Sequence, residues 1–286
     1  MIKTFRKFIP KPYQHFMQAN MRAVASYSTI ARGFLRNQNW QLGAGNLGAD
    51  DSSNVRVSAD SSNPLQLYFD SHTEGRGIWK WKHYFEIYHR HFQKFIGQEV
   101  HILEIGVYSG GSLDMWKSYF GPKSRIYGVD IEEACKEYED ESVKIFVGDQ
   151  SDRNFWKLFK EEVPAIDIII DDGGHETHQQ IVTLEEMLPH LRPGGVYLCE
   201  DVGGSFNRFA SYISGFTWNL NALNEAKADT DENGRFRFTS IPTQFQASVH
   251  SVHLYPFVTV IEKNEKPMDE LVAPKHGTQW QPFKFK

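Results

Sequence analysis

From Val100 onward, short apolar runs alternate along the chain with longer amphipathic stretches. Continuous apolar runs of this length are typical of strands that are buried on both faces of a parallel sheet. The runs are Val100–Ile105, Arg125–Val129, Val143–Val147, Ile166–Ile170 and Val196–Cys199, and the stretches between them begin near Ser112, Ile131, Asp152 and Glu176. Strands and helices that alternate in this way, joined by right-handed crossovers, predict an α/β fold with a doubly wound sheet.

The segments on either side extend this pattern. Ala247–Tyr255 and Phe257–Glu262 are predicted to be two strands with a tight connection at Pro256, so the mostly parallel sheet should end in a C-terminal antiparallel pair. Before the sheet, Gln38–Pro64 has the polar composition of a linker, and Lys80–Phe95 predicts a helix. The expected divisions are a basic N-terminal extension with its linker (1–67), an aromatic-rich helical cap (68–97), the doubly wound domain (98–265) and a C-terminal tail (266–286).

Composition narrows the class of protein. Of the 286 residues, 40% are hydrophobic and 23% charged, which is ordinary for a soluble globular protein. The net charge of −5 argues against a nucleic-acid partner. Cys135 and Cys199 have no metal-binding spacing, so we expect a reduced protein in the cytoplasm. No apolar run approaches the roughly 20 residues that a membrane span requires.

The N-terminal segment is the one region with a charge bias. Residues 1–48 contain no acidic residue but several lysines and arginines. Three interpretations fit this composition: a solvated extension, a transit peptide, or a basic helix that rests on an anionic membrane surface or on a partner.

A glycine-rich turn follows the first predicted strand, in the sequence LEIGVYSGGS from Leu103 to Ser112. Glycines allow a sharp turn and a close approach to a ligand, and Ser112 is placed to cap the next helix. The spacing differs from Gly-x-Gly-x-x-Gly, which disfavours a dinucleotide. Glu104 precedes the first glycine, and its carboxylate suits a cationic amino-acid ligand better than a phosphate. A purely structural strand-to-helix turn is the alternative.

Acidic residues also close the next two strands. Asp130 follows the second strand, where a carboxylate can accept hydrogen bonds from ribose hydroxyls, and Asp149-Gln150 follows the third, where it would meet an adenine edge. Each aspartate alone could instead be a helix N-cap. Together these residues predict a site for S-adenosyl-L-methionine. The candidate cofactor-binding residues are Glu104, Gly106, Ser109, Gly110, Ser112, Asp130, Asp149, Gln150 and Asp172.

The fourth and fifth strands end in a richer set of polar residues, Asp171-Asp172-Gly173-Gly174-His175 and Glu200-Asp201. Because the ends of adjacent parallel strands converge, Asp172, Glu200 and Asp201 should share one pocket. Three carboxylates repel one another unless a cation holds them, and oxygen ligands favour Mg²⁺ over zinc. These three residues are therefore the candidate metal ligands.

His175 is the candidate general base. Histidine is the side chain that most readily accepts a proton near neutral pH, and a hydroxyl acceptor must lose its proton before it attacks a methyl group. Three alternatives stand beside this interpretation. Asp171 or Asp172 could cap the helix that begins near Glu176, His175 could be structural, and His178 could form a metal-binding pair with it.

At these residues the sequence resembles the macrocin- and mycinamicin-type sugar O-methyltransferases and, beyond them, the cephalosporin hydroxylase-like group. The resemblance lies in the segments LEIGVYSGGSLDMW, YGVDI, VGDQSD, IIIDDGGH and LRPGGVYLCEDV. It extends more weakly to WKHYFEIYHRHF upstream and to SVHLYPFVTVIEKNE and PKHGTQWQPF downstream.

This resemblance implies a Rossmann-like methyltransferase fold that uses S-adenosyl-L-methionine and Mg²⁺. It also implies a sugar hydroxyl acceptor on a glycoside, polysaccharide or glycolipid, and a homo-oligomer. Matched by motif, Asp172, Glu200 and Asp201 correspond to metal ligands, His175 to the base, and Glu104, Gly106, Ser112, Asp130 and Gln150 to cofactor contacts. The residues before Tyr68 do not resemble the family's N-terminal domain, which argues against a macrolide acceptor.

Three other functions stay open at this stage. One is a catechol-type or other small-molecule O-methyltransferase, since a vicinal diol would chelate the same metal. Another is a cephalosporin hydroxylase-like protein, and the third is a cofactor-binding subunit without catalysis. The aromatic side chains Trp79, Trp81, Tyr84 and Tyr88 are candidates for a wall against a sugar ring, with helix packing as the alternative.

Overall fold

The protein, in a computed structural model, is described at Tyr27, at Arg32 and over residues 63–163, 165–203, 207–222 and 226–279. The chain divides into two units, Met1–Asp60 and Ser61–Lys286. Only Tyr27 and Arg32 are described in the first, so the predictions about the basic extension and nearly all of the linker fall outside the described residues. No helix in the described ranges has the length and apolar character needed to cross a bilayer.

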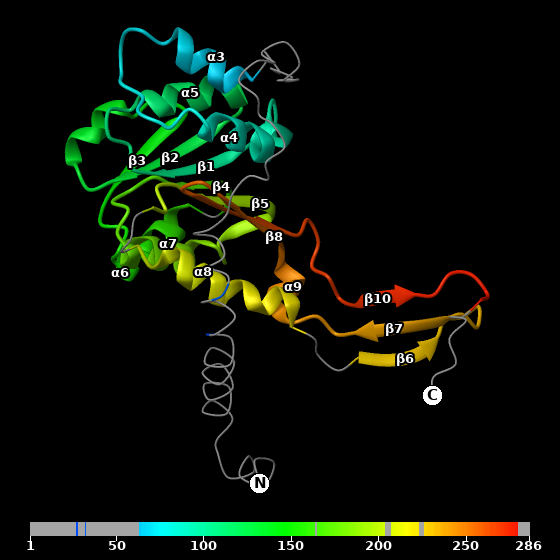
Figure 1. The fold of residues 1–286 in the computed structure, drawn as a ribbon. Coiled ribbons are helices and arrows are strands. Elements are labelled where there is room, and N and C mark those ends of the chain that lie inside the picture. The colour runs from blue at the N-terminus through cyan, green and yellow to red at the C-terminus, as the bar shows by residue number, and fades with distance from the viewer. Residues whose placement is uncertain are drawn as a thin grey trace, which may run out of the picture. The chain divides into compact units, whose positions relative to one another are not determined.

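The second unit is built on a seven-stranded sheet with the order β3-β2-β1-β4-β5-β9-β8 (Figure 1). The first five strands are parallel: β1 (His101–Ile105), β2 (Arg125–Asp130), β3 (Val143–Val147), β4 (Ile166–Asp171) and β5 (Leu191–Cys199). The antiparallel pair β8 (Val249–Tyr255) and β9 (Val258–Lys263) completes one edge. The predicted mostly parallel, doubly wound sheet is confirmed. Strand order reverses between β1 and β4, which is where such folds bind ligands.

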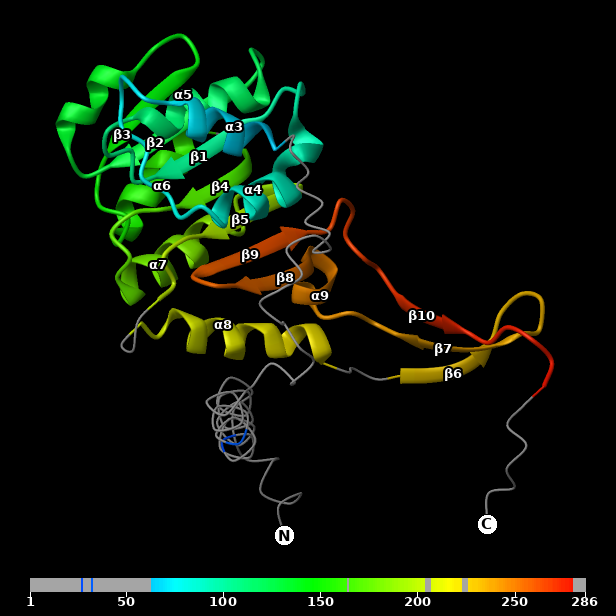
Figure 2. The same cartoon turned by 45° about the horizontal axis from the view of Figure 1, so that its top comes forward.

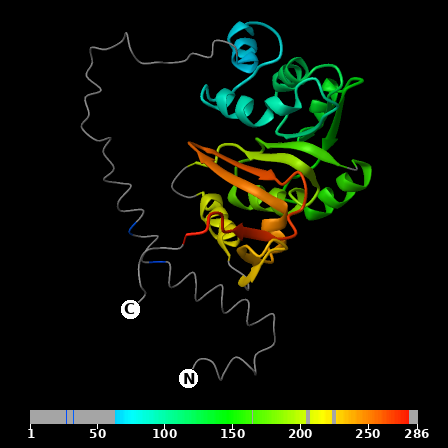
Figure 3. The ribbon, with the colours of Figure 1, turned by 90° about the vertical axis from the view of Figure 1, so that its right-hand side faces the viewer.

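Helices cover both faces of the sheet because alternate residues of the strands point in opposite directions. Ile168 and Ile170 pack with α3 (Pro64–Ser71), α4 (Tyr84–Phe92) and α5 (Gly111–Phe120). Ile169 packs on the opposite side, with α6 (Arg153–Glu162), α7 (Thr177–Met187) and α8 (Phe209–Thr217). Figures 2 and 3 show the two helical layers with the sheet between them.

Three local predictions differ from the structure. The helix expected over Lys80–Phe95 begins at Tyr84 and ends in a 3-10 turn, η2 (Gln93–Phe95). The amphipathic stretch near Ile131 forms only a 3-10 helix, η3 (Glu133–Tyr138). Gly110, in a left-handed conformation, is the N-cap of α5 in place of Ser112, which lies inside the helix.

A small second sheet was not predicted. Its strands β6 (Ala226–Thr230), β7 (Phe236–Ser240) and β10 (Leu271–Pro274) pair in the antiparallel order β10-β7-β6. The connecting segments contain η4 (Trp218–Asn221) and α9 (Gln244–Ser248). β10 thus lies inside the predicted tail, and α3 runs across the predicted boundary at residue 67. The proposed domain ranges stay a prediction.

Candidate active site

Residues that follow all five parallel strands line one pocket of about 970 Å³. Because parallel strands present their carboxyl ends at one edge, polar residues far apart in the sequence meet there. The predicted site residues that line it are Gly106, Ser109, Ser112, Asp130, Asp149, Gln150, Asp172, His175, Glu200 and Asp201. Among the predicted cofactor contacts, Glu104 and Gly110 are not part of the lining.

The glycine-rich turn after β1 is held by the acid after β2. Gly106 has φ +88°, and a Cβ there would lie 2.0 Å from the carbonyl oxygen of Asp172, so only glycine fits. Oδ2 of Asp130 accepts hydrogen bonds from the backbone N–H groups of Val107 (2.9 Å) and Tyr108 (3.0 Å). Asp130 therefore joins the ends of β1 and β2, and it is not the N-cap of η3, which is Glu132.

Glu104 lies behind the wall of the pocket and not in it. Its carboxylate is fully buried and accepts hydrogen bonds from the Ser112 hydroxyl (3.0 Å) and the Trp116 indole (3.0 Å). Burial raises the pKa of Glu104 to about 7, and the Lys80 charge and the Trp116 hydrogen bond oppose that rise. The side chain that was predicted to touch a cationic ligand is thus engaged by two residues of α5.

Asp149 and Gln150, the residues that follow β3, make different kinds of contact. The Asp149 carboxylate accepts a hydrogen bond from the Ser151 N–H (2.7 Å), while Asp152 is the N-cap of α6, so the capping alternative for Asp149 does not apply. The Gln150 side chain is buried; it donates to Asp171 (2.9 Å) and accepts from the Gly174 N–H (2.8 Å). Gln150 therefore fixes the turn after β4 from the floor of the pocket.

The catalytic candidates come together at the ends of β4 and β5. His175 Nε2 lies 3.6 Å from Asp201 Oδ2 and 4.0 Å from Asp172 Oδ1, and one ligand atom from each of the three residues lies within 4.8 Å of the others. His175 and Asp201 have φ values of +58° and +52°, a conformation that non-glycine residues adopt rarely and often at functional sites. Asp172 and Asp201 could hold a cation between them.

Two alternatives for this turn can be set aside. The N-cap of α7 is Glu176, not Asp171 or Asp172. The backbone N–H of Glu176 donates to the side chain of Gln179 (3.2 Å). His178 is exposed, lines no part of the pocket and does not belong to the Asp172–His175–Asp201 group.

Lys80 is a pocket residue that the sequence did not point to. Its side chain is 3% exposed; Nζ donates to Asp172 and lies 3.0 Å and 3.1 Å from the two oxygens of Glu200. Burial lowers the pKa of Lys80, but the Asp172 and Glu200 carboxylates outweigh it and hold the pKa well above its ordinary value. A cation was expected among the three acids, and in this structure the Lys80 ammonium group supplies that charge through its contacts with Asp172 and Glu200.

Glu200 is accordingly the most enclosed of the predicted metal ligands. Its carboxylate is fully buried, and besides Lys80 it accepts a hydrogen bond from the Tyr88 hydroxyl (2.7 Å). Burial and the neighbouring Asp172 carboxylate raise the pKa of Glu200, whereas Lys80 and Tyr88 act in the opposite direction. A metal at Asp172 and Asp201 could include Glu200 only if Lys80 gave up its place.

Some aromatic residues before and within α4 line the wall of the pocket, and others are buried in the hydrophobic core. The Tyr84 hydroxyl and the Trp81 indole both donate to Asp201 Oδ1, at 2.7 Å and 3.1 Å. Trp79 is 88% exposed and Trp81 55% exposed, and both line the pocket. Tyr88, in contrast, is fully buried and is not available to a ligand.

Comparison with known proteins agrees with this geometry. Residues 103–202 match a family model described as a methyltransferase domain. The chain is 41% identical over 123 residues to mycinamicin VI 2''-O-methyltransferase of Micromonospora griseorubida, a match over 40% of this chain and 30% of that protein. Demethylmacrocin O-methyltransferase of Streptomyces fradiae is 38% identical over 122 residues, again 40% of this chain and 30% of the relative. The predicted family resemblance is confirmed.

A solved structure of this methyltransferase type has the same core. The mycinamycin-pathway methyltransferase MycE, in complex with Mg and SAH, is 26% identical with a TM-score of 0.55, covering 71% of this chain and 54% of its own. The aligned parts of the curated relatives amount to about a third of their length. The chain therefore matches only part of these relatives and not the relatives as whole proteins.

Proposed function

We propose that this protein is an S-adenosyl-L-methionine-dependent, Mg²⁺-assisted O-methyltransferase that acts on a sugar hydroxyl of a glycoside, polysaccharide or glycolipid. The observation that carries the proposal is the convergence of the Gly106 turn, Asp130 and the Asp172–His175–Asp201 group on one pocket of about 970 Å³. The relatives named as O-methyltransferases support the same chemistry, and two of them are named as acting on rhamnosyl derivatives of tetracenomycin C. We expect the protein to act in natural-product or polysaccharide biosynthesis.

The cofactor half of the pocket would be formed by the turns after β1, β2 and β3. Gly106 keeps the first turn open, Asp130 presents its carboxylate where ribose hydroxyls could bind, and Asp149 lies where an adenine edge could bind. Gln150 and Glu104 act less directly, since both are buried and hold neighbouring loops or helix residues in place. Ser109 and Ser112 complete the lining after β1.

The acceptor half would be formed by Asp172, His175 and Asp201. The carboxylates of Asp172 and Asp201 fit a divalent cation, which leaves the His175 imidazole free, and a bound Mg²⁺ would lower the pKa of an acceptor hydroxyl. His175 would then accept the hydroxyl proton at a ring nitrogen, because its exposed imidazole faces the pocket. Asp201, bound by Tyr84 and Trp81, would hold the imidazole in position from the other side.

The exposed rings of Trp79 and Trp81 are suited to pack against the apolar face of a sugar. These rings support a glycan or small glycoside as the acceptor, and the net charge of −5 argues against a nucleic-acid partner. We also expect a cytoplasmic homo-oligomer.

The decisive experiment combines cofactor binding with turnover. S-adenosylhomocysteine should bind the purified protein with micromolar affinity in calorimetry, and a panel of sugars should include at least one acceptor that is methylated in the presence of Mg²⁺. His175→Ala should abolish methyl transfer while leaving cofactor affinity unchanged. The matched control is His178→Ala, three residues further along and exposed.

Two results would count against the proposal. Absence of cofactor binding would refute the methyltransferase assignment itself. Full turnover in His175→Ala would instead refute only the role of His175 as the base.

A further inference from the structure

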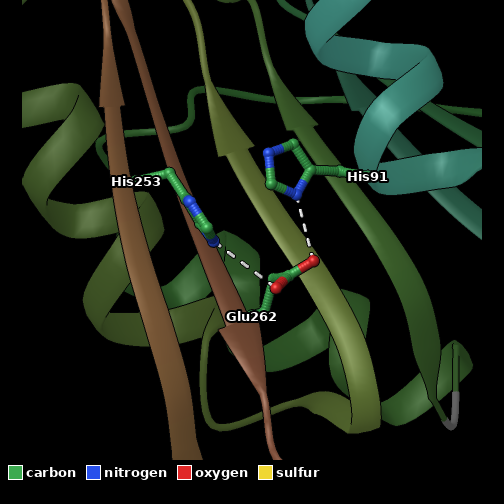
Figure 4. Close-up of side chains that lie close together, drawn as sticks. All are labelled: His91, His253 and Glu262. Carbon is green, nitrogen blue, oxygen red and sulfur yellow. Dashed lines mark hydrogen bonds and ion pairs between the residues drawn. The ribbon is translucent and has the colours of Figure 1, made fainter.

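A second group of metal-binding side chains lies outside the pocket. It brings together His91 of α4, His253 of β8 and Glu262 of β9 (Figure 4). His91 Nδ1 is 3.0 Å from Glu262 Oε1, and His253 Nε2 is 3.5 Å from Glu262 Oε2. One ligand atom from each residue lies within 4.8 Å of the other two. Each oxygen of the glutamate thus faces one imidazole. The Ser251 hydroxyl donates to Glu262 Oε2 (3.0 Å) and lies 3.0 Å from His253 Nε2, so a bound ion would replace these two contacts.

Two oxygen atoms orient the His91 ring. Its Nε2 is 3.0 Å from the Tyr255 hydroxyl, so both ring nitrogens face oxygen atoms. In one tautomer of His91, Nδ1–H donates to Glu262 and Nε2 accepts from the Tyr255 hydroxyl. In the other, Nε2–H donates to Tyr255, and the lone pair of Nδ1 faces Glu262 and His253, where it can coordinate a metal ion. A metal-binding histidine commonly uses its other nitrogen in this way, to donate to an oxygen that fixes the ring.

We propose that His91, His253 and Glu262 form a second metal site, which takes a divalent transition-metal ion such as Zn²⁺. Two imidazoles and one carboxylate are a known zinc-binding set, and they suit Zn²⁺ better than Mg²⁺, which prefers oxygen ligands. His91 is 3% exposed and anchors the site, while the 37% exposed side chain of His253 leaves it open to solvent. Water can therefore supply the remaining coordination position.

This site is distinct from the acid group at the end of the sheet. Glu262 pairs with Val196 of β5, whereas Thr259 of β9 pairs with Cys199, the residue before Glu200. Two strands and a helix meet at Glu262, several residues back from the carboxyl end of β5. None of the three side chains lines the large pocket.

The helix that carries His91 connects the proposed metal site to the acids of the pocket. Tyr84, Tyr88 and His91 are spaced to share one face of α4, and they contact Asp201, Glu200 and Glu262 in that order. An ion bound to His91, His253 and Glu262 would clamp the far end of α4 to the β8–β9 edge. The same helix face supplies the hydroxyl groups that hold the two acids of the pocket.

The test uses the untagged full chain, stripped of metal with a chelator, and titrates it with Zn²⁺ in a calorimeter. We expect wild type to show a binding event that His253→Ala and Glu262→Gln lose. Loss of an outer-shell partner lowers the metal affinity of a site by roughly 10–100-fold. Removal of a direct ligand should lower the Zn²⁺ affinity at least as much. His250→Ala, an exposed histidine on the same strand, is the matched control and should keep it.

A variant of the pocket separates the two sites. Asp201→Ala removes a residue of the acid group, so a Zn²⁺ event that survives in Asp201→Ala and disappears in His253→Ala belongs to the proposed site. Zn²⁺ should also raise the melting temperature of wild type and His250→Ala more than that of His253→Ala, which keeps only the acid group of the pocket. The proposal is overturned if no event follows this pattern, or if His253→Ala and His250→Ala bind and respond to Zn²⁺ alike.

Discussion

At the scale of single residues, the charge balance of the pocket depends on Lys80. Its ammonium group is the partner of two buried or half-buried carboxylates, so replacing it leaves both without a cation. Lys80→Met should lower the free energy of unfolding by about 3–5 kcal/mol in the presence of a chelator, as removal of one partner from a buried ion pair does. Saturating Mg²⁺ should restore part of this loss, because a bound ion can take over the neutralising role.

Urea denaturation with chelator or with Mg²⁺ measures both effects. Lys82→Met is the control, because Lys82 is exposed two residues further along the same segment. We expect Mg²⁺ to stabilise Lys80→Met more than wild type or the control. Equal stabilisation of all three proteins would mean that Lys80 and the metal do not share the same carboxylates.

The same residue marks the limit of what the sequence can predict about the site. Asp172, His175, Glu200 and Asp201 were predicted to converge because they follow adjacent strands, and the ends of parallel strands meet. Lys80 lies in a segment without regular structure, and nothing in its neighbours indicates which strand end it faces. A lysine between two tryptophans in an aromatic-rich segment was the only available signal.

At the scale of elements, the turn that leads into β3 should give a pH-dependent contribution to stability. Asp140 Oδ1 accepts hydrogen bonds from the N–H groups of Ser142 (2.8 Å) and Val143 (3.0 Å), and Oδ2 accepts one from Lys117 (2.9 Å). Partial burial raises the pKa of Asp140, but these hydrogen bonds lower it more, to well below its ordinary value. The stabilisation is therefore present above the unfolded-state pKa of about 4 and is lost as the pH falls toward the folded-state value.

Asp140→Asn keeps an acceptor oxygen but removes the charge. Because the side chain is 43% exposed, the loss at pH 7 should be only about 0.5–1 kcal/mol of unfolding free energy. Urea titrations at pH 7 and pH 3 should show the difference between wild type and variant shrinking at the lower pH. A difference that stayed constant with pH would show that the charge of Asp140 contributes nothing.

Helices and strands could be predicted where burial imposes a pattern of apolar residues on the sequence, and they were missed where it imposes none. Ile166–Ile170 is a continuous apolar run because β4 is covered on both faces, so its strand could be recognised. Every residue of β6 is exposed, and its sequence AKADT has no apolar face to detect. The start of α4 was placed too early because the Trp and Lys residues before it fit a helical pattern, although they contact the acids of the pocket instead.

At the scale of the whole molecule, the second sheet should behave as a less stable part than the seven-stranded core. β4 is almost entirely buried. In the small sheet, all of β6 and most of β10 are exposed, and only Thr239 and Ser240, both in β7, are buried. Local opening costs least where few apolar groups are buried. In hydrogen-exchange mass spectrometry, peptides from β6 and β7 should therefore exchange within minutes and those from β1 and β4 over hours or longer.

Ligand binding provides the internal control for this prediction. S-adenosylhomocysteine should slow exchange in peptides that contain Gly106 and Asp172, because both line the pocket, and should leave β6 unchanged. The residues of the small sheet also lie outside the segment that matches the methyltransferase domain, residues 103–202. If β6 and β7 exchange as slowly as β4, or gain protection with the ligand, the small sheet unfolds together with the core and must be treated as part of it.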